Sequence, residues 1–88
     1  MRVQFRRSFS KDLRKVRKKA LQQQIQALIE QAERVDSLRE IGNVKQLTAD
    51  GPYSRIRIGD YRVGITVEDD TITFIRCLHR RDIYRYFP

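Results

Sequence analysis

The fold is decided by residues 53–78, which read YSRIRIGDYRVGITVEDDTITFIRCL. Apolar and polar side chains alternate along this stretch, which is the pattern of half-buried β-strands. The Gly59-Asp60 and Asp69-Asp70 pairs interrupt the alternation as two-residue turns, so the strands on either side of each turn must be antiparallel neighbours. The predicted strands are Tyr53–Ile58, Tyr61–Glu68 and Ile72–Leu78.

Upstream of this meander the sequence predicts a short strand and then helix. Met1–Arg6 alternates and is free to join the sheet. Ser10 is a good N-cap and Asp12 suits the first helical turn, so the helix is expected to begin near Lys11. Two apolar stripes of helical period follow, out of phase by roughly 110°. They comprise Leu13, Val16 and Ala20, and then Leu21, Ile25, Leu28, Ala32 and Val35.

The phase difference between the stripes leaves two arrangements open. Two helices that meet near Lys18–Leu21 and pack as a hairpin account for it, although no Gly or Pro marks the turn. A continuous, bent helix is the alternative. Gly42 ends the helical region, residues 44–47 are extended, and Asp50-Gly51-Pro52 forms a turn. The expected fold class is therefore α+β, with an N-terminal helical hairpin packed on one face of a small antiparallel β-sheet.

Length and composition predict one small domain of the cytoplasmic type. The 88 residues suit a single domain over 1–88, and no stretch has the roughly 18 apolar residues of a transmembrane helix. The lone Cys77 excludes an internal disulfide and a multi-cysteine zinc site, which favours a reducing cytoplasm. The lone His79 and the scattered carboxylates lack the spacing of metal ligands, so we expect neither a metal nor a cofactor.

The net charge of +8 is distributed unevenly along the chain. Residues 1–19 contain nine basic side chains and one acidic one, residues 20–50 contain three and five, and residues 51–88 contain seven and five. All seven basic residues of the last segment are arginines. This asymmetry predicts a polyanionic partner, and nucleic acid, above all RNA, fits best. A solvated surface is the plainer reading.

Three arginines of the predicted sheet share one face. Period two directs Ile56 and Ile58 toward the helices and directs Arg55 and Arg57 to the other face. Arg62 points the same way, and across the Gly59-Asp60 turn it pairs directly or nearly so with Arg57. Arginines side by side repel each other, and a phosphate bound through their guanidinium forks would relieve that repulsion. Exposed arginines chosen for solubility are the alternative.

The C-terminal segment and the first predicted helix are the other candidate surfaces. Aromatic and basic residues interleave in residues 79–88, a mixture suited to stacking on unpaired bases and holding phosphates. His79 is the natural proton-transfer candidate, although a lone histidine at a strand end is more often structural. The expected RNA- or ribosome-binding residues are Lys11, Arg14, Lys15 and Lys18, one helical stripe, and Arg81 and Arg85.

These residues together resemble the RelE/ParE superfamily of toxins from type II toxin–antitoxin systems. The resemblance covers essentially the whole chain. It rests on Phe9-Ser10-Lys11-Asp12-Leu13, on Lys45-Gln46-Leu47, and on residues 53–63 and 75–84. It implies a RelE-like fold and a metal-independent mRNA endoribonuclease that works in the ribosomal A site and so inhibits translation. A cognate antitoxin is the implied protein partner, and operator DNA would be bound only through the toxin–antitoxin complex.

The resemblance also implies roles for individual residues. The ribose 2′-OH would attack the adjacent phosphate and leave a 2′,3′-cyclic phosphate and a 5′-OH. Arg55 and Arg57 match the family's paired basic strand residues, and Arg62 matches an arginine that stabilises the scissile phosphate. Arg80 matches a later catalytic arginine, although an ungapped alignment chooses Arg81. Tyr84 matches a tyrosine that stacks on or orients a base.

The sequence departs from the best-studied pattern where arginines replace lysines. Arg55 and Arg57 stay protonated and cannot readily exchange a proton, so His79 or Tyr84 would carry more of the proton transfer. The pair Gly64-Ile65, often bulkier and aromatic, departs as well. Two alternatives remain open: a ParE-like poison of DNA gyrase that hydrolyses nothing, and a non-catalytic nucleic-acid-binding module.

Overall fold

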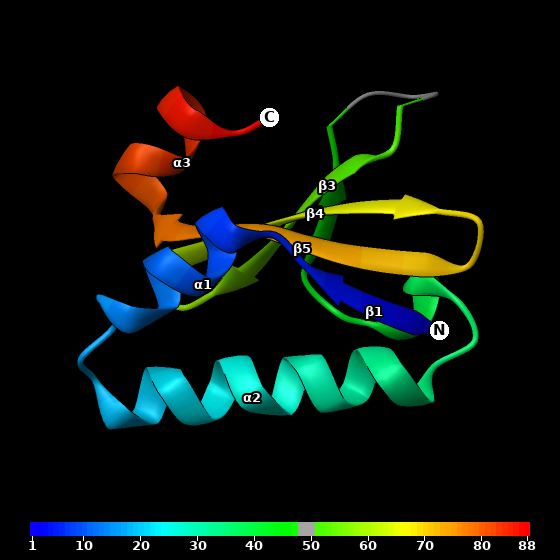
Figure 1. The fold of residues 1–88 in the computed structure, drawn as a ribbon, viewed down its shortest axis with the longest axis horizontal. Helices are drawn as coiled ribbons and strands as arrows, with labels where there is room; N and C mark the ends of the chain where they lie inside the picture. The colour runs from blue at the N-terminus through cyan, green and yellow to red at the C-terminus, as the bar shows by residue number, and fades with distance from the viewer. Residues whose placement is uncertain (48–50) are drawn as a thin grey trace.

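The computed structural model describes residues 1–47 and 51–88 of the chain, and Asp50 of the expected turn lies outside them. The described residues form an α+β fold, as expected (Figure 1). The elements are β1 (Arg2–Phe5), α1 (Arg7–Arg14), α2 (Lys19–Arg34), the short 3₁₀ helix η1 (Leu38–Glu40), β2 (Val44–Gln46), β3 (Tyr53–Ile58), β4 (Tyr61–Glu68), β5 (Thr71–His79) and α3 (Arg80–Tyr86).

A five-stranded sheet in the order β1-β5-β4-β3-β2 organises the fold. The predicted meander is confirmed, since β3, β4 and β5 pair antiparallel in sequence order. Gly59 has a φ of 56°, and Asp69 and Asp70 have φ angles of 49° and 61°. Those left-handed backbones suit tight hairpin turns between twisted strands. The N-terminal strand joins the sheet at its edge, parallel to β5.

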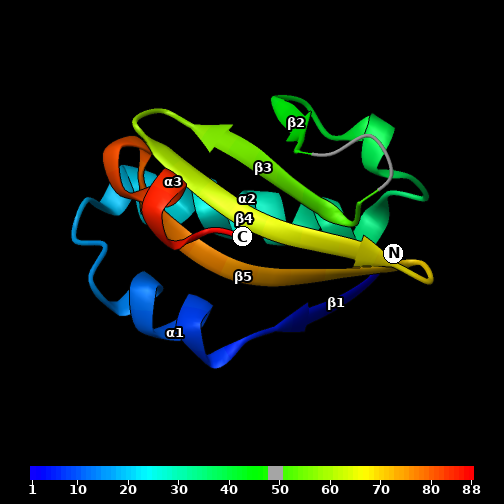
Figure 2. The same cartoon turned by 90° about the horizontal axis from the view of Figure 1, so that it is seen from above.

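The helices lie on both sides of the sheet. Figure 2 shows α2 behind the sheet and α3 in front of it. The core fills the space between α2 and the inner face of the sheet, where Ile25, Ile56, Val63 and Phe74 are almost completely buried. One face of the sheet is therefore covered along its length by α2. The other is covered only where α3 folds back, which leaves part of it accessible.

Two separate helices are confirmed, and the chain reverses direction between α1 and α2 (Figure 1). The expected packing of the two helices against each other is not observed, because α1 packs mainly on β5. The connection comprises residues 15–18, slightly earlier than the expected Lys18–Leu21. Val16 of the first stripe is buried and Leu13 is half-buried, but Ala20 is exposed because it lies on the outer side of the first turn of α2. The whole second stripe, from Leu21 to Val35, is buried.

The expected start of the first helix was wrong. The helix begins at Arg7, so Ser10 lies inside it and caps nothing. Another serine replaces it as an anchor, because the Ser8 hydroxyl donates to the carbonyl oxygen of Ile75 at 2.6 Å. The next residue, Phe9, is buried against Phe74 with 5.3 Å between the ring centroids. Long-range packing on β5, rather than a cap, therefore sets the start of the helix.

Asp12 has a different role from the expected interaction with the helix dipole. It is buried in the middle of α1. Its carboxylate accepts from Arg76 Nε at 2.7 Å, from Arg76 Nη2 at 3.1 Å and from the backbone N–H of Cys77 at 2.9 Å. The hydrogen bond with Asp12 is the main reason why the pKa of Arg76 is raised. This pair joins α1 to β5.

Cys77 is expected to be chemically inert in the folded protein. Its side chain is buried, and burial, helped by the negative charge of Asp12, raises the pKa of its thiol to about 12. The thiolate is the reactive form, so the folded chain should resist iodoacetamide at pH 8 and should react once urea unfolds it. Mass spectrometry of the alkylated chain measures this. Stoichiometric labelling of the native protein, as fast as that of the unfolded chain, would contradict the prediction.

Candidate active site

The predicted arginine face exists in the sheet. Arg57 of β3 pairs directly with Arg62 of β4, as the hairpin register predicted. Arg55 lies two residues before Arg57 on β3 and therefore on the same face. The intervening Ile56 and its partner Val63 are buried on the opposite face, under α2. The alternation of the strands thus separates an apolar core face from a cationic face.

The three arginines surround one pocket of about 310 Å³. Lys45 of β2 and Tyr84 of α3 also line it. The remaining walls come from the segment that leads into β2. The complete lining comprises Asn43, Val44, Lys45, Arg55, Arg57, Arg62 and Tyr84. Residues from β2 and the segment before it, from β3 and β4, and from α3 therefore meet at one site, although Asn43 and Tyr84 are 41 positions apart in the chain.

Each arginine is held by a different contact. Arg62 donates from Nη1 to the carbonyl oxygens of Gly59 at 3.0 Å and Tyr61 at 2.9 Å. Arg57 donates from Nη2 to Asn43 Oδ1 at 3.4 Å. The guanidinium carbon of Arg55 lies 4.4 Å from the centroid of the Tyr84 ring, a cation–π arrangement. These contacts orient the guanidinium groups and leave their positive charge unneutralised.

The pocket has a strong excess of positive charge. Four of its lining residues are cationic and none is acidic. Within the described residues, the one ion pair joins Arg76 to Asp12, outside the pocket lining. Cations directly opposite each other in a sheet destabilise it. A bound phosphate group would offset that cost, because guanidinium groups bind phosphate through paired, charge-assisted hydrogen bonds.

The C-terminal helix brings Tyr84 to this pocket. Ile83 is fully buried, and Phe87, 4% exposed, packs edge-on against Tyr53 with 5.7 Å between ring centroids. Tyr84 itself is 71% exposed, so most of its ring remains free. Phe87 thus closes the edge of the core, whereas the neighbouring Tyr86 is 52% exposed.

Gly64 makes room for this helix, and replacing it is expected to displace the C-terminus. A Cβ at Gly64 would lie 2.7 Å from Phe87 Cγ and Cδ1, well inside contact distance. Gly64→Ala should therefore destabilise the fold by about 1–3 kcal/mol. Urea unfolding measures the loss. Gly42→Ala is the matched control, because a Cβ there meets nothing within 4 Å.

A double-mutant cycle tests whether the effect of Gly64→Ala runs through Phe87. Phe87→Ala removes the obstructing ring, so the losses from Gly64→Ala and Phe87→Ala should be less than additive. Fully additive losses would mean that Gly64 does not act through Phe87.

The structure does not bring His79 into the arginine pocket. His79 is the N-cap of α3, and its Nδ1 accepts from Arg81 N at 3.1 Å and Arg81 Nε at 3.3 Å. Its ring packs edge-on against Tyr61. It lines a separate pocket of about 550 Å³ with Lys15, Lys18 and other residues. These contacts fit a structural role at the start of α3, and the proton-transfer role of His79 stays a prediction.

Arg80 and Arg81 lie at the first turn of α3, outside the lining of the arginine pocket. The backbone N–H of Arg80 donates to the carbonyl oxygen of Asp60 at 2.7 Å, while its side chain is exposed. The side chain of Arg81 is directed to His79. Because neither residue lines the arginine pocket, the pocket lining does not decide which of the two is the catalytic arginine.

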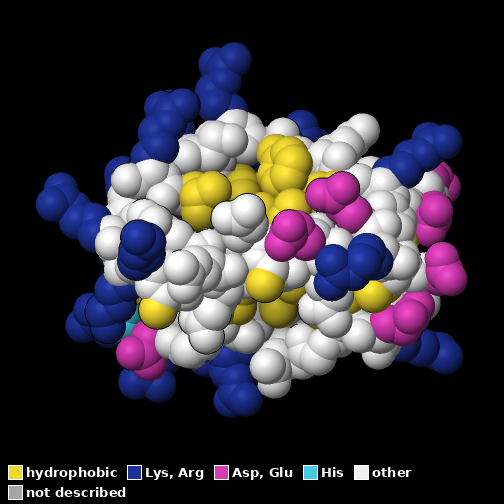
Figure 3. Space-filling view, turned by 90° about the horizontal axis from the view of Figure 1, so that it is seen from below, with side chains coloured by type: hydrophobic (Ala, Val, Ile, Leu, Met, Phe, Trp, Pro, Cys, Tyr) yellow, Lys and Arg dark blue, Asp and Glu magenta, His cyan; other side chains and the backbone are white. Residues whose placement is uncertain are grey.

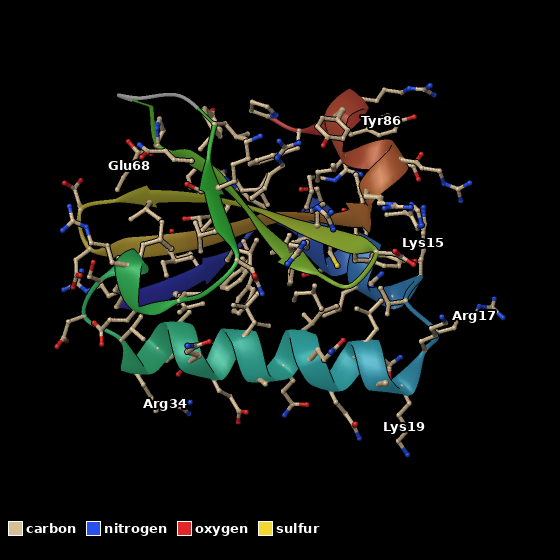
Figure 4. The ribbon with its side chains drawn as sticks, turned by 180° about the vertical axis from the view of Figure 1, so that it is seen from behind. Lys15, Arg17, Lys19, Arg34, Glu68 and Tyr86 are labelled. Atoms are coloured by element: carbon tan, nitrogen blue, oxygen red, sulfur yellow. The ribbon has the colours of Figure 1, made fainter. Side chains whose placement is uncertain are left out.

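The basic residues expected to bind RNA are all exposed, but they do not form one helical stripe. α1 ends at Arg14, so Lys11 and Arg14 are helical while Lys15 and Lys18 belong to the connection to α2. Arg85 is exposed on α3. Figure 4 shows Lys15, Arg17 and Lys19 projecting from the connection end of the molecule. On the α2 side, Figure 3 shows apolar side chains near the centre, acidic ones mainly in the right half of the view and basic ones mostly around the edge.

Sequence reasoning missed Lys45 and Asn43 as pocket residues. Lys45 pairs with Arg55 across the β2–β3 ladder, which places both side chains on one face. The carbonyl oxygen of Asn43 accepts from the backbone N–H of Arg57 at 3.0 Å, so this segment is tied to β3 as well. The local sequence signal was the extended character of residues 44–47, which does not reveal the pairing register.

In residues 1–47 and 51–88, no group of three or more His, Cys, Asp or Glu side chains is placed to hold a metal ion. No helix of the same residues is long and apolar enough to span a membrane.

The fold and its cationic sheet face define a class of protein, the toxin subunits of toxin–antitoxin complexes. The RelB–RelE antitoxin–toxin complex from Methanococcus jannaschii contains a chain that matches with a TM-score of 0.82 at 40% identity, over 97% of this chain and 99% of that one. The archaeal RelE–RelB complex from Pyrococcus horikoshii OT3 gives a TM-score of 0.74 at 29% identity, with coverage of 90% and 93%.

The chain belongs to the ParE toxin family of type II toxin–antitoxin systems, whose family model matches residues 3–84. It is 42% identical, over the full length of both chains, to Toxin RelE3 of Methanocaldococcus jannaschii. The predicted RelE/ParE resemblance and the predicted fold are thereby confirmed, and the protein is a type II toxin.

Proposed function

We propose that this toxin is a ribosome-dependent mRNA endoribonuclease whose active site is the arginine pocket. The observation that carries the proposal is the convergence of Arg55, Arg57 and Arg62 with Tyr84 around one cationic pocket. A gyrase poison that hydrolyses nothing would not require a phosphate-binding pocket beside an exposed aromatic ring. The match to RelE-named relatives supports the same function.

In the proposed reaction, the ribose 2′-OH attacks the adjacent phosphorus and displaces the 5′-oxygen of the next nucleotide. Negative charge builds on the non-bridging oxygens as the phosphorus becomes five-coordinate. Arg57 and Arg62, directly opposite each other on β3 and β4, would stabilise that charge with pre-oriented donors. The guanidinium groups supply the positive charge, so the proposed reaction uses no metal and no cofactor.

Tyr84 would hold the nucleotide beside the scissile phosphate. Its exposed ring offers a stacking surface for an unpaired base, and Arg55 supports the ring through the cation–π contact. Stacking of this kind contributes about 1–3 kcal/mol per base. Arg80 stays a predicted second catalytic arginine. The exposed basic residues farther from the pocket would contact the RNA backbone. They are Lys11, Arg14, Lys15, Lys18, Arg81 and Arg85.

The protein partners follow from the same proposal. The RelB–RelE relatives were solved as antitoxin–toxin complexes, so we propose a cognate antitoxin that neutralises this chain by covering its basic surface. Operator DNA would be bound only by that complex. Because ribosomes and mRNA are the proposed targets, the toxin would act in the cytoplasm, as one domain spanning residues 1–88.

Primer extension on an mRNA in a translating extract tests the proposal. Wild-type protein should give codon-phased cuts that require ribosomes, and the Arg62→Ala variant should give none. Arg39→Ala is the matched control, because Arg39 is an exposed arginine on η1 outside the pocket lining. An absence of cuts with wild-type protein, while translation continues normally, would refute the ribonuclease.

A gyrase poison is the second candidate, because the matching family model is that of the ParE toxin. A supercoiling assay with purified gyrase distinguishes it. Inhibition of supercoiling without RNA cleavage would support the ParE-like activity. Inactivity in both assays would favour the third hypothesis, a non-catalytic nucleic-acid-binding module.

A further inference from the structure

The arginine pocket contains few groups that can exchange a proton. The proposed cleavage needs two proton transfers, one from the attacking 2′-OH and one to the departing 5′-oxygen. A guanidinium group does not release a proton under these conditions. Among the residues that line the pocket, Lys45 and Tyr84 are the ones with an ionisable group other than a guanidinium. His79 lines a different pocket.

Lys45 lies at the wall of the pocket opposite Arg62. It is on β2, directly paired with Arg55 of β3, while Arg62 is on β4, directly paired with Arg57 of β3. Neighbouring strands are about 4.8 Å apart, and the two pairs are two residues apart along β3, so the backbone positions of Lys45 and Arg62 lie about 12 Å apart across β3. Both residues line the same pocket, and their side chains are long enough to reach a phosphate group placed over β3 between them.

In-line displacement requires the attacking and departing oxygens at opposite poles of the phosphorus. A proton donor must therefore lie at one pole, beside the group that holds the equatorial oxygens. Lys45 meets this condition from the β2 wall, since its exposed side chain carries an ammonium with three protons to donate. Tyr84 is held with its ring against the Arg55 guanidinium, which suits a base-stacking role.

Given the proposed ribonuclease activity, we propose that Lys45 is the general acid that protonates the departing 5′-oxygen. The 2′-oxygen–phosphorus bond forms while the phosphorus–5′-oxygen bond breaks. The 2′-OH proton passes to solvent water, and the Lys45 ammonium gives a proton to the 5′-oxygen to yield the 5′-OH product. Water then returns a proton to the neutral Lys45 amine. In this way Lys45 supplies the proton that Arg55 and Arg57 cannot.

The test uses two mRNAs programmed into ribosomes, one natural and one with sulfur in place of the scissile 5′-oxygen. A thiolate leaves without being protonated, so the sulfur substrate needs no general acid. Lys45→Arg keeps the positive charge but removes the proton donor. It should cleave the natural mRNA about 100-fold or more slowly than the wild type and the sulfur mRNA at close to the wild-type rate.

Three further variants make the result specific. Arg62→Ala should remain defective on both substrates, because it stabilises the phosphorus centre rather than the leaving group. Tyr84→Phe should keep the wild-type ratio between the two substrates. Lys19→Arg, an exposed lysine outside the pocket lining, should behave as the wild type. Circular dichroism and RNA binding of Lys45→Arg should match those of the wild type.

Two outcomes would overturn the assignment of Lys45. A natural-substrate rate unchanged in Lys45→Arg would show that no proton from Lys45 is needed. An equal defect on both substrates would show that Lys45 only positions the RNA. If the wild-type protein cleaves neither substrate, the ribonuclease proposal itself fails, and that result is distinct from a failure of Lys45 alone.

Discussion

Replacing Arg62 by alanine is expected to abolish growth arrest while the protein stays folded. Arg62 shares the pocket with Arg57 and is fixed there by hydrogen bonds to two carbonyl oxygens of the β3–β4 turn. Loss of one such pre-oriented donor typically lowers the rate by about 10²–10³-fold, or about 2.7–4 kcal/mol of transition-state stabilisation. Growth after induction and the rate of mRNA cleavage measure the effect.

The fold should survive Arg62→Ala because the side chain is not part of the core. Its hydrogen-bond acceptors, the carbonyl oxygens of Gly59 and Tyr61, are at a surface turn where water can replace the guanidinium. The unfolding midpoint in urea should therefore change little. Arg62→Lys keeps the charge but loses the planar fork, and an intermediate activity is expected. A folded Arg62→Ala protein that remained fully toxic would exclude the proposed site.

Replacing Asp12 by alanine should have the largest effect on stability. The Asp12 side chain is 5% exposed and binds both Arg76, 23% exposed, and the backbone N–H of Cys77. Removing it leaves a partly buried guanidinium and a buried backbone N–H without a partner. Breaking a buried pair of this kind lowers the free energy of unfolding by about 3–5 kcal/mol. Small domains have about 5–15 kcal/mol of total stability, so this loss should be visible as a large fall in the urea midpoint.

Two companion variants separate charge from hydrogen bonding at Asp12. Asp12→Asn retains an acceptor for the Cys77 N–H and should lose less than Asp12→Ala. Asp12→Leu combined with Arg76→Leu replaces the pair by apolar side chains and should recover part of the loss. Asp36→Ala, an exposed aspartate on the loop before η1, is the control. If Asp12→Ala unfolded at the same urea concentration as this control, the pair would not stabilise the fold.

Much of the cationic face could be predicted from the sequence because it depends on local rules. The alternation of apolar and polar residues placed Arg55 and Arg57 on one face. The two-residue turn at Gly59-Asp60 set the hairpin register and so paired Arg57 with Arg62. The arrival of Tyr84 in the same pocket was predicted only through the family resemblance, since its position depends on how Phe87 packs over Gly64.

The errors of the sequence analysis involve long-range contacts. Asp12 was assigned to a helix terminus because an acidic residue after Ser10 fits that local pattern. Its partner Arg76 is 64 positions away in the chain, and no local pattern connects the two. The proton-transfer role of His79, predicted from its chemistry, is a different case, because it stays a prediction. The direction of its side chain depends on the contacts with Arg81 and Tyr61 at the start of α3.

By itself, the sequence determined the α+β class, the antiparallel meander with its cationic face, the two apolar helix stripes and the resemblance to the toxin superfamily. Those features depend on periodicities and turns that span a few residues. Only the tertiary structure decided the parallel pairing of β1 with β5, the Asp12–Arg76 pair and the position of Lys45 opposite Arg62. Each of these joins elements far apart in the chain, and packing and strand register, rather than local periodicity, determine which distant elements meet.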